Sequence, residues 1–198
     1  MSSVVVHRPP VCVSLGLLAW AVVASAVALA GLMPRLGPPV VAAAIGGGVA
    51  LGLLARRTSP AARAWTERVS LRGLVLYQAV RAPIGGLFLW LHAHGRMPAE
   101  FAQVAGWGDI IAGLGALLAA ACLPATTRRR RAVVLLWNAV GLLDILVVVA
   151  TAQKLMLLDG RDDMLAGFLA LPLLPVIPLF LVPTVILAHL VVFARLRR

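Results

Sequence analysis

The chain has 198 residues, of which 62% are hydrophobic and 13% charged, and its net charge is +11. This composition, with a mean hydropathy of +0.99, excludes an ordinary soluble domain and favours an integral membrane protein. A transmembrane β-barrel is excluded as well, because the apolar residues form long runs typical of spanning helices and do not alternate with polar residues.

Basic residues gather in alternate connections between the apolar runs. Thirteen arginines fall on one side of the expected membrane and four basic residues on the other, as the positive-inside rule predicts for cytoplasmic termini. We therefore expect an all-α, polytopic transmembrane helix bundle with six spans and both termini in the cytoplasm. This distribution disfavours nucleic-acid binding and predicts contact with anionic lipid headgroups on the cytoplasmic face. The larger group comprises Arg8, Arg56, Arg57, Arg63, Arg68, Arg72, Arg128, Arg129, Arg130, Arg131, Arg195, Arg197 and Arg198, and the smaller one Arg35, Arg96, Lys154 and Arg161.

The first two spans are expected at residues 11–33 and 39–55. The first has the basic start and small-residue end of a signal peptide, but its apolar run exceeds the ~7–15 residues of a signal core. We expect an uncleaved helix, with cleavage as the alternative. In the second span small residues recur every four positions and predict close helix packing; they are Ala44, Gly48 and Gly52. The basic connection 56–70 is expected to hold a short interfacial helix.

The third span, residues 71–94, is apolar but carries polar side chains in its middle. At 100° per residue, Tyr77, Gln78, Arg81 and His92 fall on one face, which is therefore polar along most of the membrane. Pro83 gives no N–H to the helix and crowds the carbonyl four residues earlier, so we expect a kink around Arg81.

The remaining spans are expected at residues 107–123, 132–153 and 174–194. Trp107 suits the membrane interface, and Asp109 is then in the first helical turn, where the helix dipole favours a carboxylate. Asn138 and Asp144 lie within the fifth span. The last apolar region is too long for one perpendicular helix. We expect an interfacial or re-entrant piece at 164–171 before the last span, or one long kinked helix. The whole chain is expected to form a single integral membrane domain.

Depth in the membrane suggests how the buried charges pair. Arg81 lies ~15 Å from the inner end of its helix and Asp144 ~18 Å from the inner end of its own, at 1.5 Å per residue. The two are expected to form an ion pair, because an uncompensated charge at this depth is costly. Asp109 comes out about 12 Å farther toward the exterior, so we place it with His92 and Glu100 in an outer polar cluster.

These residues suggest a polar cavity between the third and fifth helices. Intramembrane ionisable groups commonly line substrate or proton paths, and the first hypothesis is binding or proton-coupled transport of a small solute. The alternative of equal weight is that the ion pair only orients helices, since apolar packing can replace such pairs. The candidate polar-network residues are Arg81, Asp144, Asp109, His92, Asn138, Gln78, Tyr77 and Glu100.

Two further classes of function are weighed against transport. One is a structural or assembly subunit that meets a partner membrane protein or a second copy of itself. The other is a haem- or quinone-linked electron-transfer subunit, which the histidine positions disfavour, because His92 and His189 lie too far apart in depth to share an iron and His7 is outside the first span.

Metal and cofactor sites are not expected. An enzyme is a further possibility, in which Asp109 with Asp144 or His92 would perform acid–base chemistry on a lipid. The sequence contains no hydrolase or metalloprotease motif, and Cys12 and Cys122 belong to no metal-ligand spacing. One lysine stands against seventeen arginines, with abundant Ala, Leu and Val. This bias is associated with GC-rich bacterial genomes, and we expect a multi-pass protein of a bacterial inner membrane.

Overall fold

The structure, a computed structural model, describes residues 9–197, and helices are the regular secondary structure in that range. Six helical segments in it are long and apolar enough to cross a membrane, which confirms the predicted all-helical class and the number of apolar helices. His7, Arg8 and Arg198 lie outside the described residues. The six segments are α1 (Val11–Leu29), α2 (Met33–Thr58), α4 to α5 (Leu71–Tyr77, a 3₁₀ turn η1 at Gln78–Val80, and Arg81–Ala93), α6 (Ala99–Ala121), α7 (Arg128–Gln153, extended by a π-helical turn η2 at Lys154–Leu158), and the π-helical turn η3 (Ile177–Leu181) with α9 (Val182–Leu196).

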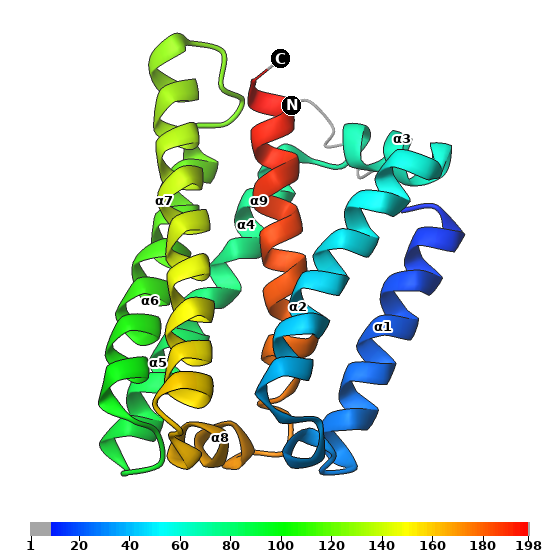
Figure 1. The fold of residues 1–198 in the computed structure, drawn as a ribbon. Coiled ribbons are helices and arrows are strands. Elements are labelled where there is room, and N and C mark those ends of the chain that lie inside the picture. Colours follow the sequence, from blue (N-terminus) through cyan, green and yellow to red (C-terminus); the bar gives the residue numbers. More distant parts are fainter. Residues whose placement is uncertain (1–8, 198) are drawn as a thin grey trace.

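Two short helices complete the described chain. α3 (Pro60–Arg68) follows α2, and its N-cap Ser59 accepts a hydrogen bond from the backbone N–H of Ala62. It is the short helix expected between the second and third spans. α8 (Asp162–Leu169) precedes the last span and lies across one end of the bundle (Figure 1). The last apolar region is therefore two separate helices and not one long kinked helix.

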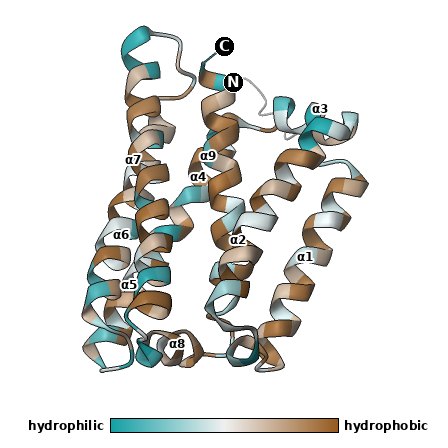
Figure 2. Cartoon of the chain, viewed as in Figure 1, coloured by the Kyte–Doolittle hydropathy of each residue, from teal (hydrophilic) through white to brown (hydrophobic). Residues whose placement is uncertain are grey.

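The long helices run alternately up and down in one bundle (Figure 1). The start of α1, the end of α9, α3, and the connection between α6 and α7 lie at one end, which we call the basic end because it gathers the basic residues of alternate connections. α8 lies at the opposite end. Figure 2 shows apolar residues along the long helices and hydrophilic residues concentrated toward the two ends, the distribution that a helix bundle in lipid requires.

Prolines and one glycine interrupt the helices at defined places. α2 is bent at Gly37, whose φ of 68° is open to glycine at little cost. The expected kink near Arg81 is present as the 3₁₀ turn η1, three to five residues before Pro83. In the last span, Pro183 gives no N–H to the carbonyl of Leu179. The Trp20 indole N–H of α1 donates to that oxygen instead, at 3.0 Å.

The fourth span begins earlier than predicted. It was expected to start near Trp107, but α6 starts at Ala99, directly after Pro98. Asp109 therefore lies in the middle of the helix and not in its first turn, and Trp107 is an exposed residue whose indole N–H donates to Gln103. The start signal was a proline followed by Glu100 in the first turn, where a carboxylate is favoured.

Candidate functional site

Three charged side chains from three helices meet in the middle of the bundle. We call them the charged triad, comprising Arg81 of α5, Asp109 of α6 and Asp144 of α7. The Arg81 Nε donates to the Asp109 Oδ1 at 2.6 Å, and its Nη2 donates to the Asp144 Oδ2. The Nη1 donates to the backbone oxygen of Gly141 at 2.9 Å. Arg81 and Asp109 are buried, so these charge-assisted bonds replace the water that a guanidinium otherwise needs.

Glycines let the three helices approach closely enough for these contacts. A Cβ added at Gly85 of α5 would meet the α6 backbone and come within 3.0 Å of the Asp109 Cβ. A Cβ at Gly108 of α6 would collide with the Asp144 carboxylate. Small residues at such crossings are what drives helix association in lipid, where packing replaces hydrophobic burial. The triad therefore sits where α6 packs between α5 and α7.

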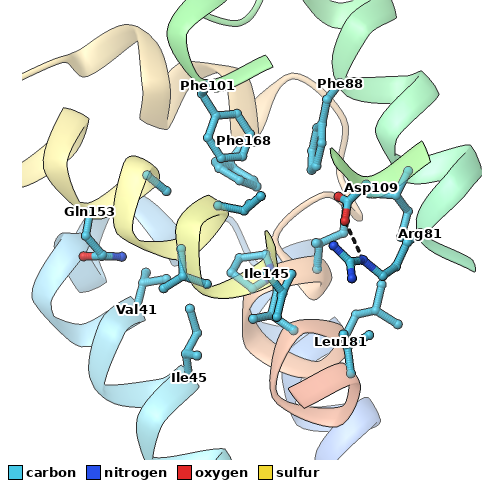
Figure 3. A pocket seen from close by; sticks show the side chains of 18 of the residues that line it. Val41, Ile45, Arg81, Phe88, Phe101, Asp109, Ile145, Gln153, Phe168 and Leu181 are labelled. Carbon is cyan, nitrogen blue, oxygen red and sulfur yellow. Dashed lines mark hydrogen bonds and ion pairs between the residues drawn. The ribbon is translucent and has the colours of Figure 1, made fainter. Parts of the chain in front are cut away.

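A cavity of about 50 Å³ lies beside the triad, and its lining extends to Phe168 of α8. Figure 3 shows Arg81 and Asp109 together at one side of it and Gln153 at the other. The side-chain oxygen of Gln153 is buried and has no partner among the described residues. The remaining walls are apolar and come from α2, α5, α6, α7, α8 and the η3 to α9 segment; they include Val41, Ile45, Phe88, Phe101, Ile145, Phe168 and Leu181.

Three phenylalanines separate this cavity from the end of the bundle that α8 covers. Phe88, Phe101 and Phe168 come from α5, α6 and α8, and their ring centroids lie 5.2 to 6.1 Å apart in edge-to-face contacts. α8 is seated closely, because a Cβ on Gly167 would come within 2.8 Å of the Arg96 backbone oxygen. The phenylalanines and α8 thus close the cavity on this side.

His189 of α9 and Asn138 of α7 form a second polar contact. The Asn138 Nδ2 donates to the His189 backbone oxygen at 3.1 Å, and the Asn138 Oδ1 lies 2.8 Å from the His189 Nδ1. Both side chains are fully buried. The imidazole packs on Gly141, where an added Cβ would lie 2.8 Å from its Cε1 and 3.6 Å from the Arg81 Nη1. This pair therefore adjoins the charged triad.

Two more polar side chains of the third span also face α9. The Gln78 Nε2 donates to the Val185 backbone oxygen at 3.2 Å, and the Tyr77 hydroxyl lies 2.6 Å from the Thr184 Oγ1. Thr184 in turn lies within hydrogen-bond distance of two backbone oxygens of the preceding turn, which leaves its oxygen to accept from Tyr77. The polar face of the third span is therefore joined to both α7 and α9.

The outer polar residues lie near α8, apart from the triad. His92 contacts the Met97 backbone oxygen, with its Nδ1 3.1 Å away, and lines an open crevice of about 580 Å³ between the α5 to α6 connection and α8. Glu100 accepts a hydrogen bond from Arg161 at 3.0 Å. Arg161 also donates to Asp163, which lowers the pKa of that carboxyl.

The structure brings together part of the predicted set. Arg81 contacts Asp144, the pairing expected from depth. The expected cluster of Asp109 with His92 and Glu100 does not form, because the early start of α6 places Asp109 at the level of Arg81. The cavity also differs from the expected polar one. Its walls are mainly apolar, and Asn138, Gln78 and Tyr77 bond to α9 and are not among the residues that line it.

His189 and Thr184 are members of the network that the sequence analysis did not select. His189 was considered only as a haem ligand. A signal was present, since Val185, His189, Val192 and Leu196 recur at helical spacing and all prove buried. A histidine on the buried face of an apolar helix needs polar partners.

Among residues 9–197 no group of three or more His, Cys, Asp or Glu side chains is placed to hold a metal ion.

Comparisons with known proteins identify a family but no activity. No curated protein and no solved structure matches the chain. One family model matches residues 38–197, from α2 to the end of α9. The chain therefore belongs to the family described as Domain of unknown function (DUF8737).

Proposed function

We propose that this chain binds a proton at the charged triad and moves it across the membrane, alone or together with a small solute. The observation that carries the proposal is the composition of the triad, which sets two carboxylates against one guanidinium. With all three groups ionised the triad holds one surplus negative charge, which is costly in a low-dielectric interior. A bound proton removes that charge, so the site favours taking one up.

Asp144 is the carboxylate suited to exchange the proton. Its side chain is 19% exposed, against 5% for Asp109. The ionisable groups that face it are Arg81 of α5 and Asp109 of α6, with His189 of α9 beyond Arg81, whereas α2 contributes apolar side chains to this region. Release of the proton from Asp144 is thus governed by the bond to Arg81 and by the second carboxylate.

The cavity supports the binding of a small solute next to the charged triad. Its volume of about 50 Å³ exceeds the ~10–15 Å³ that one water molecule requires. Its apolar walls offer few hydrogen bonds away from the triad. A solute that enters would therefore be held by the charged end and by Gln153, as expected for a molecule of a few heavy atoms with one polar group.

The basic end supports an orientation for this movement. Four groups of arginines lie there, together with the start of α1 and the end of α9: the two at the end of α2, those of α3, the four at the start of α7 and those at the end of α9. By the positive-inside rule this end faces the cytoplasm. The cavity and the crevice beside His92 then lie in the outer half of a bacterial inner membrane.

The test measures proton movement in liposomes that contain the purified full chain. A trapped pH-sensitive dye reports the internal pH after an external acid pulse, with the membrane potential clamped, in the absence and presence of a panel of small solutes. We expect the wild type to acidify the interior and Asp144→Asn to slow it to the rate of protein-free liposomes.

Asp162→Asn is the matched control, because it makes the same chemical change on an exposed carboxylate of α8 and should behave as the wild type. Equal proton movement in the wild type and Asp144→Asn, or none in the wild type with any solute, would contradict the proposal. The triad would then be a structural device that orients helices.

A further inference from the structure

Asn138 fixes which nitrogen of His189 carries a proton. The Asn138 amide nitrogen donates to the His189 backbone oxygen, so its side-chain oxygen faces the His189 Nδ1. That oxygen can only accept, and the Nδ1 must therefore be the protonated nitrogen. In the neutral imidazole the Nε2 then carries a lone pair and is an acceptor.

Two buried acceptors in this region have no donor among the described residues. They are the His189 Nε2 and the Gln78 Oε1, on side chains that are 0% and 1% exposed. Both side chains are held from their other atoms, His189 by Asn138 and Gln78 by the Val185 backbone oxygen. Neither acceptor can turn toward a new partner without breaking an existing bond, and buried acceptors require one.

Spare donors lie beside the His189 Nε2, and Gln78 precedes the residue that carries them by three positions, one helical turn, in the same span. The Arg81 guanidinium has five N–H groups, of which three donate to Asp109, Gly141 and Asp144. The remaining two belong to Nη1 and Nη2. A Cβ on Gly141 would lie 3.6 Å from the Arg81 Nη1 and 3.3 Å from the His189 Nε2, so the two nitrogens flank the same point.

We propose that the His189 Nε2 and the Gln78 Oε1 form a binding site for a water molecule beside Arg81. Water fits this set of groups, because it accepts from the guanidinium and donates to two acceptors at once. A cation is excluded by the adjacent positive charge, and an anion by the two lone pairs. The site extends the path of a proton from the charged triad toward α9. His189 is a positioning residue, which holds the water in place.

The role of the bound water rests on the proposed proton movement. The existence of the site does not, since the site is defined by the two acceptors. In that role the bound water takes a proton released from the triad and passes it on through hydrogen bonds on the His189 side. No covalent bond other than O–H is made or broken, and each proton taken up is matched by one released.

The experiment detects water at His189 directly. The full chain, with ¹⁵N-labelled histidine, is placed in lipid bilayers, and solid-state NMR transfers magnetisation from water protons to the imidazole nitrogens. The His189 signals are identified by their loss in His189→Gln. We expect rapid transfer from water to the His189 Nε2 although this side chain is buried, with a rate that approaches that of the exposed His94. A dry His189 would overturn the site.

Gln78→Leu keeps the size of the side chain and removes the second acceptor, so we expect it to slow the transfer to His189. Gly86→Ala, on the same span where an added Cβ meets no atom within 4 Å, is the control and should leave the transfer unchanged. An unchanged rate in Gln78→Leu would overturn the paired site. If that variant does not fold, the wild-type measurement alone decides.

The two proposals fail in different ways. A dry His189 in a protein that moves protons through Asp144 overturns the water site and leaves the proposed function intact. A hydrated His189 in a protein that moves no protons supports the water site and contradicts the proposed function.

Discussion

Arg81 holds two other helices through three different nitrogens. Its Nε reaches α6, and its Nη1 and Nη2 reach a backbone oxygen and a carboxylate of α7. Only a guanidinium offers donors in this fork, whereas the ammonium of a lysine is a compact point charge. The residue at position 81 therefore determines both the charge of the site and the spacing of α5, α6 and α7.

Removing this side chain leaves two carboxylates without a cation, the buried one of Asp109 and the half-buried one of Asp144. We expect Arg81→Gln to lower the free energy of unfolding by about 3–5 kcal/mol, the usual cost of breaking a buried pair from one side. Adding Asp109→Asn and Asp144→Asn to it should recover part of the loss, because no buried charge then remains. Denaturant unfolding in detergent micelles, followed by circular dichroism, measures both variants.

Arg161→Gln is the control for the loss of a guanidinium, since the bonds of Arg161 to Glu100 and Asp163 lie at the exposed surface and surface pairs contribute little. The explanation in terms of charge fails if the triple variant is less stable than Arg81→Gln.

At the scale of the element, the crossing of α5 and α6 sets the geometry of the site. Gly85 lies against the α6 backbone next to Asp109, while its neighbour Gly86 faces open space. The two positions differ by one residue in the same helix, so they share its propensity and its depth. Their different surroundings separate the effect of the crossing from that of the helix.

Gly85→Ala should therefore destabilise the protein by about 1–3 kcal/mol, as overpacking does, because the backbone of α6 cannot yield as a flexible side chain can. Gly86→Ala should be neutral or stabilise the helix by up to about 1 kcal/mol, the difference in helix propensity. Unfolding of both variants under the same conditions gives the comparison. Equal stability would show that the backbones separate easily at this crossing.

The sequence predicted the elements better than the contacts between them. Long apolar runs and alternating basic connections are strong signals, and they identified the apolar helices. Arg81 and Asp144 were paired because both helix starts are marked by charged residues, so depth could be counted. Asp109 was misplaced because the residues before Trp107 include Glu100 and Gln103 and read as a connection.

The sequence could not predict the hydrogen-bond partners of Asn138, Gln78 and Tyr77, for a different reason. Depth along a helix gives the level of a side chain but not which neighbour it faces. Tyr77 and Asn138 were expected to join the Arg81 pair, but both bond to α9. The proline-rich start of that segment, with its π-helical turn, hid which of its side chains face the bundle.

At the scale of the whole molecule, the basic end organises the bundle. The described arginines there come from three parts of the chain, 56–72, 128–131 and 195–197, which are far apart in sequence yet gather at one end in space (Figure 1). Lys154 and Arg161 lie at the other end, next to acidic partners. The opposite end is therefore close to neutral, whereas the basic end is not, and from this difference the positive-inside rule predicts that the basic end faces the cytoplasm.

Reporter fusions test that orientation. Alkaline phosphatase is active only outside the cytoplasm, and green fluorescent protein, exported unfolded, fluoresces only inside. A fluorescent protein attached after Arg198 should fluoresce, and phosphatase inserted at Gly160, in the connection before α8, should be active. Phosphatase after Arg198 and the fluorescent protein at Gly160 are the reciprocal controls. Activity of phosphatase after Arg198 would reverse the orientation.

The bond between Trp20 and the carbonyl that Pro183 leaves free has a consequence for biogenesis. The donor Trp20 and the acceptor Leu179 are 159 positions apart. The first helix therefore emerges from the ribosome long before the acceptor has been translated. Until then α1, which is mostly exposed on its apolar surface, has only lipid and its nearest neighbours around it. The position of α1 in the bundle therefore becomes final when the last helix has been inserted.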